Sequence, residues 1–359
     1  MHQPLFKSLR VVELASVLAG PAAGMFFAEL GAEVIKIENK RTGGDVTRQW
    51  KVPEEDPQSP FSAYWCSVNW GKEIRLYDLE SEEDRQETLQ LIEGADIVIS
   101  NFQASSARKL GMDVNTLRSR NPRLIVGLIT GFPDGDPRPA YDVVLQAESG
   151  FLSMNGEPGR PPVKLPVALI DLLAAHQLKE GLLLALWNRT HTGKGCTVEV
   201  SLFEAAVASL ANQATNWLMA GHLPQRLGTL HPNIAPYGES FTCSDGVRIV
   251  LAVGNDRQFE KLCMVIGCPE LAQAQQFRSN ADRVANRQAL FDLLDARMRS
   301  LPGEPLLEQL ISAGVPAGRV RNVAEVFELA AARRMILEDK LFDGNTGKRV
   351  RTVAFRLLP

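Results

Sequence analysis

The sequence lacks several features that mark common classes of protein. It has no stretch of about 18 uncharged apolar residues, so we expect no membrane-spanning segment. Its 39 Lys and Arg residues face 42 Asp and Glu, with no long run of one sign, which argues against nucleic acid or an anionic membrane as a partner. The five cysteines include no CxxC pair. With no signal-peptide pattern at the N-terminus, we expect reduced cysteines and a cytoplasmic location.

Familiar catalytic patterns are also missing. The five histidines show no HExxH or similar spacing, so we expect no metal site. The chain contains no GxSxG nucleophile elbow either. We therefore expect a small-molecule partner rather than a macromolecule, and we expect no permanently bound cofactor.

Four apolar runs are typical of buried parallel strands, and each is followed by a loop or a helical pattern. These runs are residues 9–15, 32–38, 95–100 and 123–129. Their alternation with helices predicts a doubly wound, mostly parallel, Rossmann-like α/β sheet. Ligands of such sheets gather beyond the carboxyl ends of the strands. The expected tight turn at 18–21 and the pairs 101–102 and 131–132 fall at these ends.

The composition changes after residue 220 and suggests two domains. Residues 1–200 are expected to form a large α/β domain, completed by the strand-like segment 330–359. A linker helix and loop follow at 201–234, and a smaller α+β domain is expected at 235–325. Long helices are predicted at 172–190 and 203–220.

Asp171 is the most informative single residue. It follows an apolar stretch and opens a long helical pattern, so we expect it where backbone N–H groups are unpaired and keep its carboxylate ionised. Such a carboxylate can attack an activated acyl group. An ordinary helix N-cap is the alternative on local sequence alone.

Three further motifs leave alternatives open. The segment 19–24, Ala-Gly-Pro-Ala-Ala-Gly, suits either a phosphate-binding turn or close packing of a helix on a sheet. The basic residues around Gly43-Gly44-Asp45 can meet phosphates or form a solvated loop; they are Lys36, Lys40, Arg41 and Arg48. The loop 231–234, His-Pro-Asn-Ile, suits either carboxylate binding or a structural turn.

Taken in order, many short motifs make the chain resemble the family III CoA-transferases, also called the CaiB/BaiF family. The matching segments are 13–21, 30–38, 43–45, 95–96, 101–102, 109–112, 121–125, 130–132, 141–142, 146–147, 149–150, 170–171, 185–186 and 192–195. Each motif is short, but together they cover most of residues 8–210 in register. The ordered set is therefore specific.

The resemblance implies transfer of CoA from an acyl-CoA, such as succinyl-CoA, to a carboxylic acid. Asp171 matches the covalent nucleophile, which forms aspartyl anhydride and aspartyl-CoA thioester intermediates. His231 and Asn233 are expected to bind the substrate carboxylate. The CoA contacts carry over to Val17, Leu18, Ala19, Lys40, Arg41, Asn101, Phe102, Lys109 and Tyr141. The family also forms an interlocked homodimer of ring-shaped chains.

Three departures from the family pattern bear on activity. Leu18 stands where some members have Gln, and Glu80 stands where the family has a CoA-binding Lys. The chain also ends at Pro359, before the C-terminal tail of most members, so we expect either that a closing element of the large domain is missing or that the sequence is truncated.

The same fold also serves two alternative functions. Acyl-CoA racemases resemble this chain but have His in place of Tyr141. A non-catalytic CoA-binding protein is the other alternative. Segments 231–237 and 253–259 resemble the branch that acts on short dicarboxylates, and the polyglycine loop of the formyl and oxalate enzymes is absent. We therefore expect CoA transfer between dicarboxylates.

Overall fold

The computed structural model describes residues 5–340, 344 and 346–358. Contacts divide the chain into two compact units. Unit 1 comprises Met1–Ser153, Lys164–Pro224 and Arg334–Pro359, and unit 2 comprises Met154–Val163 and Gln225–Arg333. A division by contacts does not test which part folds independently, so the expected domain limits stay a prediction, as does the interlocked dimer.

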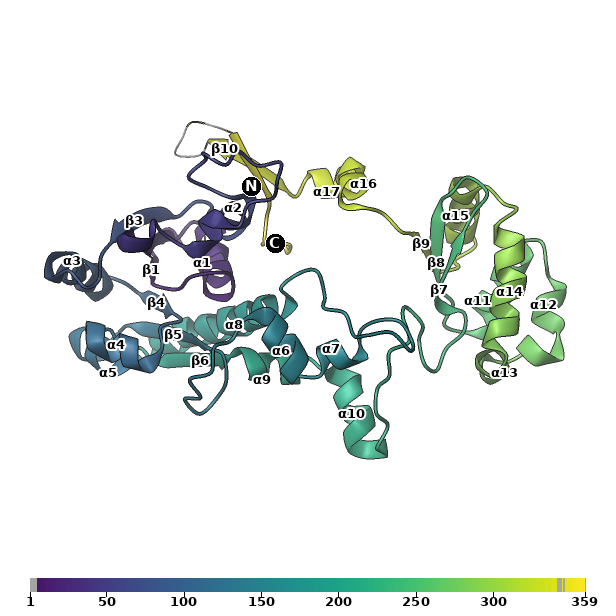
Figure 1. The fold of residues 1–359 in the computed structure, drawn as a ribbon, viewed down its shortest axis with the longest axis horizontal. Coiled ribbons are helices and arrows are strands. Elements are labelled where there is room, and N and C mark those ends of the chain that lie inside the picture. The colour runs from purple at the N-terminus through teal and green to yellow at the C-terminus, as the bar shows by residue number, and fades with distance from the viewer. Residues whose placement is uncertain (1–4, 341–343, 345, 359) are drawn as a thin grey trace. The chain divides into compact units, whose positions relative to one another are not determined.

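Unit 1 is built on a six-stranded sheet in the order β3-β2-β1-β4-β5-β6 (Figure 1). Every neighbouring pair in it is parallel, which confirms the expected parallel α/β architecture. The strands are β1 (Arg10–Glu13), β2 (Glu33–Asn39), β3 (Glu73–Tyr77), β4 (Ile97–Ser100), β5 (Ile125–Thr130) and β6 (Thr197–Ser201). The four strands expected from apolar runs are present. Strand β3 was not predicted, because its residues are exposed or half-buried and form no apolar run.

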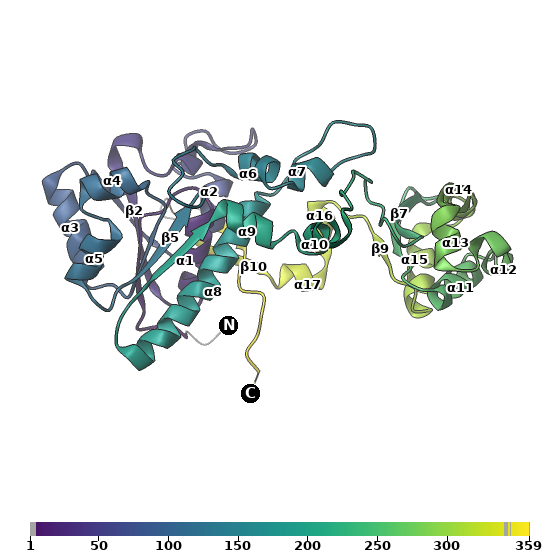
Figure 2. The same cartoon turned by 90° about the horizontal axis from the view of Figure 1, so that it is seen from below.

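Helices cover both faces of this sheet. Alternate residues of a strand point to opposite faces, so Val11 packs in one core and Val12 in the other. The core of Val11 includes α1, α8 and α9, and that of Val12 includes α3 and α5. Figure 2 shows α8 as a long helix beside α1. The helices of unit 1 are α1 (Ala19–Glu29), α2 (Ala63–Asn69), α3 (Glu82–Glu93), α4 (Ala104–Leu110), α5 (Val114–Arg120), α6 (Asp142–Glu148), α8 (Leu169–Thr192), α9 (Leu202–Ala208) and α10 (Ala211–Ala220), with the 3-10 turns η1 (Lys40–Thr42) and η2 (Val46–Gln49).

Two local predictions differ from the structure in their limits. The tight turn expected at 18–21 lies at residues 17–18, because α1 already begins at Ala19 and Pro21 lies in its first turn, where no N–H partner is needed. The single helix expected at 203–220 is divided into α9 and α10. Ala211, the first residue of α10, has a φ of +50°, which does not allow one continuous right-handed helix to pass through it. In the described part of the chain, no helix has the length and apolar character needed to cross a membrane.

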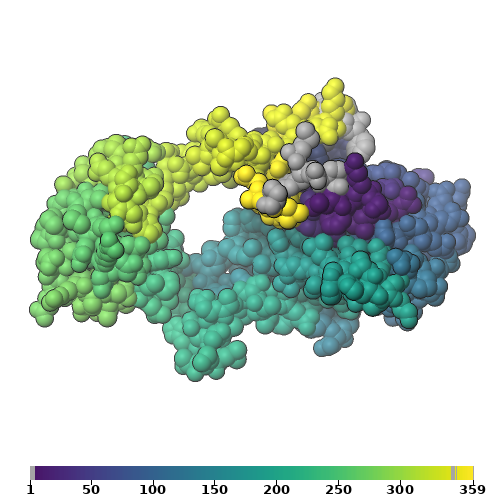
Figure 3. All heavy atoms as spheres, turned by 180° about the vertical axis from the view of Figure 1, so that it is seen from behind, coloured from purple at the N-terminus to yellow at the C-terminus, as the bar shows by residue number. Residues whose placement is uncertain are grey.

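The C-terminal segment packs on unit 1. A hairpin of β10 (Ile336–Lys340) and β11 (Thr346–Val350) precedes Val353, which is buried in the same core as Val11. Arg349 forms a buried ion pair with Glu29 of α1. In Figure 3 the yellow C-terminal residues lie against the purple N-terminal part of the chain. Among the described residues, the strand character expected for 330–359 is limited to β10 and β11.

Unit 2 combines a small antiparallel sheet with a layer of helices. Its strands are β7 (Tyr237–Thr242), β8 (Arg248–Ala252) and β9 (Ala317–Arg319), in the order β7-β8-β9. Its helices are α11 (Asp256–Val265), α12 (Glu270–Gln273), η3 (Gln275–Phe277), α13 (Asn280–Ala285), α14 (Arg287–Met298), α15 (Gly303–Ser312), α16 (Val323–Glu328) and α17 (Ala330–Arg333). A separate core forms around Phe241, Phe259 and Leu294. The short α7 (Phe151–Met154) leads from unit 1 into unit 2.

Candidate active site

The loops after β1 and β4 meet at the point where the strand order of the sheet reverses. Asn101 joins them, because its Oδ1 accepts a hydrogen bond from Ser16 N at 3.2 Å and its Nδ2 donates to Ser16 O at 3.1 Å. Such a switch point is the usual ligand site of a doubly wound sheet. The amide of Asn101 thus holds the Ser16 backbone, and the expected contact of Asn101 with CoA stays a prediction.

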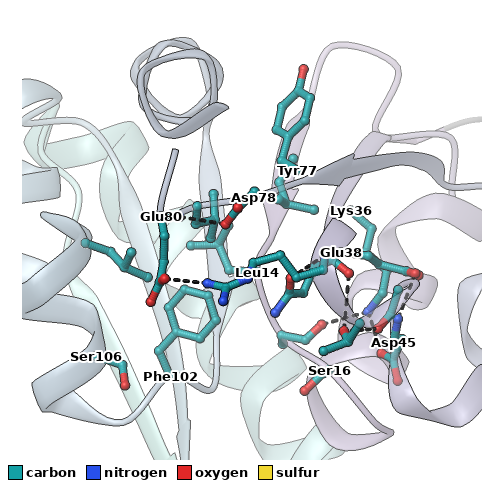
Figure 4. Close-up of a pocket in the computed structure, with 18 of the residues that line it drawn as sticks. Leu14, Ser16, Lys36, Glu38, Asp45, Tyr77, Asp78, Glu80, Phe102 and Ser106 are labelled. Carbon is teal, nitrogen blue, oxygen red and sulfur yellow. Dashed lines mark hydrogen bonds and ion pairs between the residues drawn. The ribbon is translucent and has the colours of Figure 1, made fainter. Parts of the chain in front are cut away.

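A cavity of about 460 Å³ opens at this edge of the sheet (Figure 4). Residues that follow β1, β3 and β4 line it, together with β2 and the turn after β2. Three of the expected CoA contacts, Arg41, Phe102 and Lys109, are among the lining residues. Lys40 is exposed nearby in η1 but does not line the cavity.

Glu80 pairs with two of the expected CoA-binding cations. Its carboxylate accepts hydrogen bonds from Arg41 and from Lys109 Nζ, the latter at 2.9 Å. These contacts, that of Lys109 first, hold the pKa of Glu80 below its usual value. Figure 4 shows Glu80 on the same side of the cavity as Phe102, across from Lys36 and Asp45. The carboxylate therefore stays charged and faces the cavity.

A cluster of four charged residues lies beside the cavity, and none of their side chains is exposed: Glu13, Lys36, Asp45 and Lys72. Glu13 accepts hydrogen bonds from Lys36 Nζ at 3.0 Å and from Lys72 Nζ at 2.7 Å. Lys36 Nζ also lies 3.2 Å from Asp45 Oδ2. Burial opposes the charge of Lys36, but Glu13 and Asp45 raise its pKa, whereas burial lowers the pKa of Lys72 to about 8. Each member needs its partners because an unpaired buried charge is costly.

This cluster fixes the backbone that leads to α1. Lys36 Nζ donates to Ala15 O at 2.7 Å, and Asp45 Oδ2 accepts from Val17 N at 3.1 Å. Val17 has a φ of +72°, a left-handed conformation that is strained for a β-branched residue. Gly24 of α1 allows the approach of Glu13, since a Cβ there would lie 1.9 Å from Glu13 Oε2. The small residues at 19–24 thus serve close packing.

Asp171 is buried in the first turn of α8, with 7% of its surface exposed. It is the third residue of the helix and not its cap, which is Ala168. No described residue donates a hydrogen bond to its side chain. Burial raises the pKa of Asp171 to about 7, and the nearby charge of Asp142 adds to this effect. Burial and the charge of Asp142 thus act against the ionised carboxylate that was expected at this helix terminus.

Asp142 connects α6 to the start of α8. Its Oδ1 accepts a hydrogen bond from Ile170 N at 2.7 Å, and its Oδ2 accepts from Gln146 Nε2 at 2.5 Å. Gln146 Oε1 in turn accepts from Leu165 N at 2.9 Å. The Asp142 carboxylate thus holds the backbone of Ile170, and its charge also raises the pKa of the neighbouring Asp171. Asp142 belongs to the motif at 141–142, but its sequence position did not indicate this role.

A half-buried tyrosine and two apolar residues lie beside the first turns of α8. Val17, Leu18 and Tyr64 pack in one cluster with Leu172, next to Asp171 in the helix. Burial raises the pKa of Tyr64 to about 12, and the charge of Asp171 adds to the shift. Tyr64 was missed, because nothing in its local sequence distinguishes it from a packing residue. Of the other expected contacts, Ala19 is buried in α1, and Tyr141 is 56% exposed at the N-cap of α6.

His231 and Asn233 lie in a loop of unit 2 whose backbone carbonyl groups accept hydrogen bonds from two side chains of unit 2. Arg287 donates to His231 O and Ile234 O, both at 2.6 Å, and Asn280 Nδ2 donates to Asn233 O at 2.8 Å. His231 Nδ1 accepts from Asn233 N at 3.1 Å, so a neutral ring carries its hydrogen on Nε2. The loop therefore presents an imidazole N–H donor. In the described ranges, no group of three or more His, Cys, Asp or Glu side chains could hold a metal ion.

Comparison with known proteins identifies relatives across nearly the whole chain. The model of "CoA-transferase family III" matches residues 6–357. The succinate–glutarate CoA-transferase of Agrobacterium fabrum is 36% identical, over 98% of this chain and 89% of that protein. The acetyl-CoA:oxalate CoA-transferase of Acetobacter aceti is 37% identical, over 93% and 85% of the two chains. The crystal structure of a CaiB/BaiF family protein from Brucella suis superposes with a TM-score of 0.86 at 39% identity, covering 99% and 93%.

Proposed function

Because the chain belongs to CoA-transferase family III, we propose that it transfers CoA from an acyl-CoA thioester to a short dicarboxylic acid, with Asp171 as the covalent nucleophile. The observation that carries the proposal is the position of Asp171. It is a buried carboxylate without a hydrogen-bond donor among the described residues, beside the loop that runs from the cavity through Ser16 to Leu18. A CoA thioester with its nucleotide in the cavity would follow this loop toward Asp171.

The proposed reaction passes through four acyl transfers. The Asp171 carboxylate attacks the donor thioester, which forms a mixed anhydride and releases CoA thiolate. The thiolate attacks the aspartyl carbonyl, expels the donor acid and forms an aspartyl-CoA thioester. The acceptor carboxylate attacks that thioester and forms a second anhydride, again releasing thiolate. The thiolate then attacks the acceptor carbonyl, giving the new acyl-CoA and free Asp171.

Each tetrahedral intermediate in this sequence carries an oxyanion that needs hydrogen-bond donors. The side chain of Leu18 has no amide group that could donate a hydrogen bond. Leu18 is the N-cap of α1, and its side chain forms no capping hydrogen bond. We assign the oxyanion donors to the backbone N–H groups of Ala19 and Gly20, because Pro21 has no N–H and Ala22 N already donates to Leu18 O. We assign the His231 imidazole and Asn233 to the carboxylate of the acid substrate.

An acceptor panel tests the proposed substrate class. Purified protein is incubated with succinyl-CoA and, separately, glutarate, mesaconate, itaconate, oxalate or acetate, and new thioesters are measured by liquid chromatography. We expect glutarate or the unsaturated dicarboxylates to be converted fastest. Conversion of oxalate alone would place the chain in the oxalate branch, and no conversion of any acid would contradict CoA transfer between acids. Hydroxylamine added during turnover should modify the peptide that contains Asp171.

Substitution of Asp142 should change the pH dependence of transfer. Loss of its negative charge makes Asp171 easier to ionise. We therefore expect Asp142→Asn to move the acid limb of the kcat/KM profile, which lies near pH 7 in the unsubstituted protein, to lower pH. The measurement is kcat/KM for succinyl-CoA from pH 5 to 9.

The control for this experiment is Asp136→Asn, which removes the charge of a half-buried carboxylate that pairs with Arg138 in the preceding loop. This variant should keep the profile of the unsubstituted protein. If Asp142 only holds the start of α8 through Ile170, its substitution would lower kcat/KM equally at every pH, and the acid limb would not move.

A further inference from the structure

Three exposed charged side chains meet at the cavity: Glu80 after β3, Arg41 in η1 and Lys109 in α4. We call them the Glu80 triad. Both cations direct their N–H donors at the same carboxylate, and all three side chains line the cavity. The triad carries one net positive charge, whereas a lysine at position 80 would give three.

The other charged residues that line the cavity leave little positive charge for a ligand. Lys36 is buried and paired with Glu13 and Asp45, and Glu38 is buried and paired with Arg48. In all, three basic and four acidic side chains line the cavity: Lys36, Arg41, Lys109, Glu38, Asp45, Asp78 and Glu80. Among these lining residues Arg41 and Lys109 are the exposed cations, so a bound phosphate has to share them with Glu80.

This arrangement suits a hydroxyl better than a phosphate. CoA carries a diphosphate and, in addition, a phosphate on the 3′ position of its ribose. A phosphate that approaches Arg41 and Lys109 gains charge-assisted hydrogen bonds but meets the charged Glu80 carboxylate at close range. A ribose hydroxyl can instead donate a hydrogen bond to Glu80, as ribose hydroxyls do to acidic residues in other doubly wound sheets.

We propose that Glu80 is a specificity-determining residue that lets this enzyme use thioesters of dephospho-CoA, which has a 3′-hydroxyl in place of the 3′-phosphate, about as well as those of CoA. This inference rests on the proposed function, since it assumes that the cavity holds the nucleotide end of the thioester. It concerns the nucleotide only and leaves the acid substrate open.

Calorimetric titration with CoA and with dephospho-CoA tests the inference without relying on catalysis. For the unsubstituted protein we expect the two Kd values to agree within about threefold. Glu80→Lys should tighten CoA binding about tenfold or more and leave dephospho-CoA within about threefold, because only the 3′-phosphate meets the new charge. Glu80→Gln should give an intermediate preference. The ratio of kcat/KM for the two succinyl thioesters should follow the ratio of Kd values.

The matched control is Glu83→Lys, which makes the same change of charge in the first turn of α3 at an exposed residue that does not line the cavity. It should leave the preference unchanged. A preference of the unsubstituted protein for CoA above about tenfold, or an unchanged ratio in Glu80→Lys, would overturn the inference. Equal binding of both nucleotides without transfer to any acid would contradict the proposed function alone. No binding of either nucleotide by any variant would overturn both.

Discussion

Asp171→Asn is expected to abolish CoA transfer while making the folded protein more stable at alkaline pH. The amide cannot form the anhydride, so kcat should fall at least about 1,000-fold. No hydroxylamine-sensitive aspartyl intermediate should appear in the mass spectrum of the peptide that contains residue 171. CoA itself should still bind, because the cavity lies in a different part of unit 1.

The stability gain follows from the raised pKa of Asp171. An unfolded aspartate has a pKa of about 4, whereas Asp171 has a pKa of about 7 in the folded protein. The folded state thus binds the proton more tightly, and this stabilisation is complete below about pH 4 and lost as the pH rises through 7. Asn does not ionise, so the variant should gain up to about 4 kcal/mol at pH 8 and progressively less toward pH 4.

Urea unfolding at pH 5 and pH 8 checks this prediction. All five tryptophans lie in unit 1, so their fluorescence reports on the unit that contains Asp171. The control is Asp113→Asn, whose carboxylate has a pKa lowered by hydrogen bonds, that of Thr116 first; it should not gain stability at pH 8. A variant at position 171 that retains transfer activity would show that another residue is the nucleophile.

Glu13→Gln should have the largest effect on stability. Glu13 is the shared partner of Lys36 and Lys72, and none of the three has exposed side-chain surface. Removal of its charge leaves Lys72 as a buried, uncompensated cation, and breaking a buried pair in this way costs roughly 3–5 kcal/mol. Transfer activity should also fall, because the cluster holds the strained backbone at Val17. The free energy of unfolding from urea titration measures the first effect.

Two variants show whether charge causes this loss. Glu13→Gln combined with Lys72→Met removes the pair together and should recover most of the lost stability, because Lys72 then leaves no unpaired buried charge and Lys36 keeps Asp45 as its partner. Glu33→Gln breaks the exposed pair with Arg10 and should cost less than about 1 kcal/mol. A similar small loss in Glu13→Gln would mean that water reaches the cluster and screens it.

The sequence determined the architecture, the family and the candidate nucleophile. The strands β1, β2, β4 and β5 were predictable because a strand buried on both faces must be apolar along its length. The family followed from the order of many short motifs, and Asp171 from its place among them. These features depend on residues that are close together in the chain or on their order along it.

The tertiary structure alone decided the ionisation and pairing of the charged groups. The charge that perturbs Asp171 comes from Asp142, which bonds to a residue 28 positions away, and Glu13 meets Lys72 across 59 positions. Glu80 likewise pairs with Arg41 in η1 and with Lys109 in α4, which lie 39 and 29 positions away in the chain. Whether a carboxylate is charged depends on its burial and on distances of a few ångströms to other charges. Local sequence specifies neither quantity, because folding brings these groups together from distant parts of the chain.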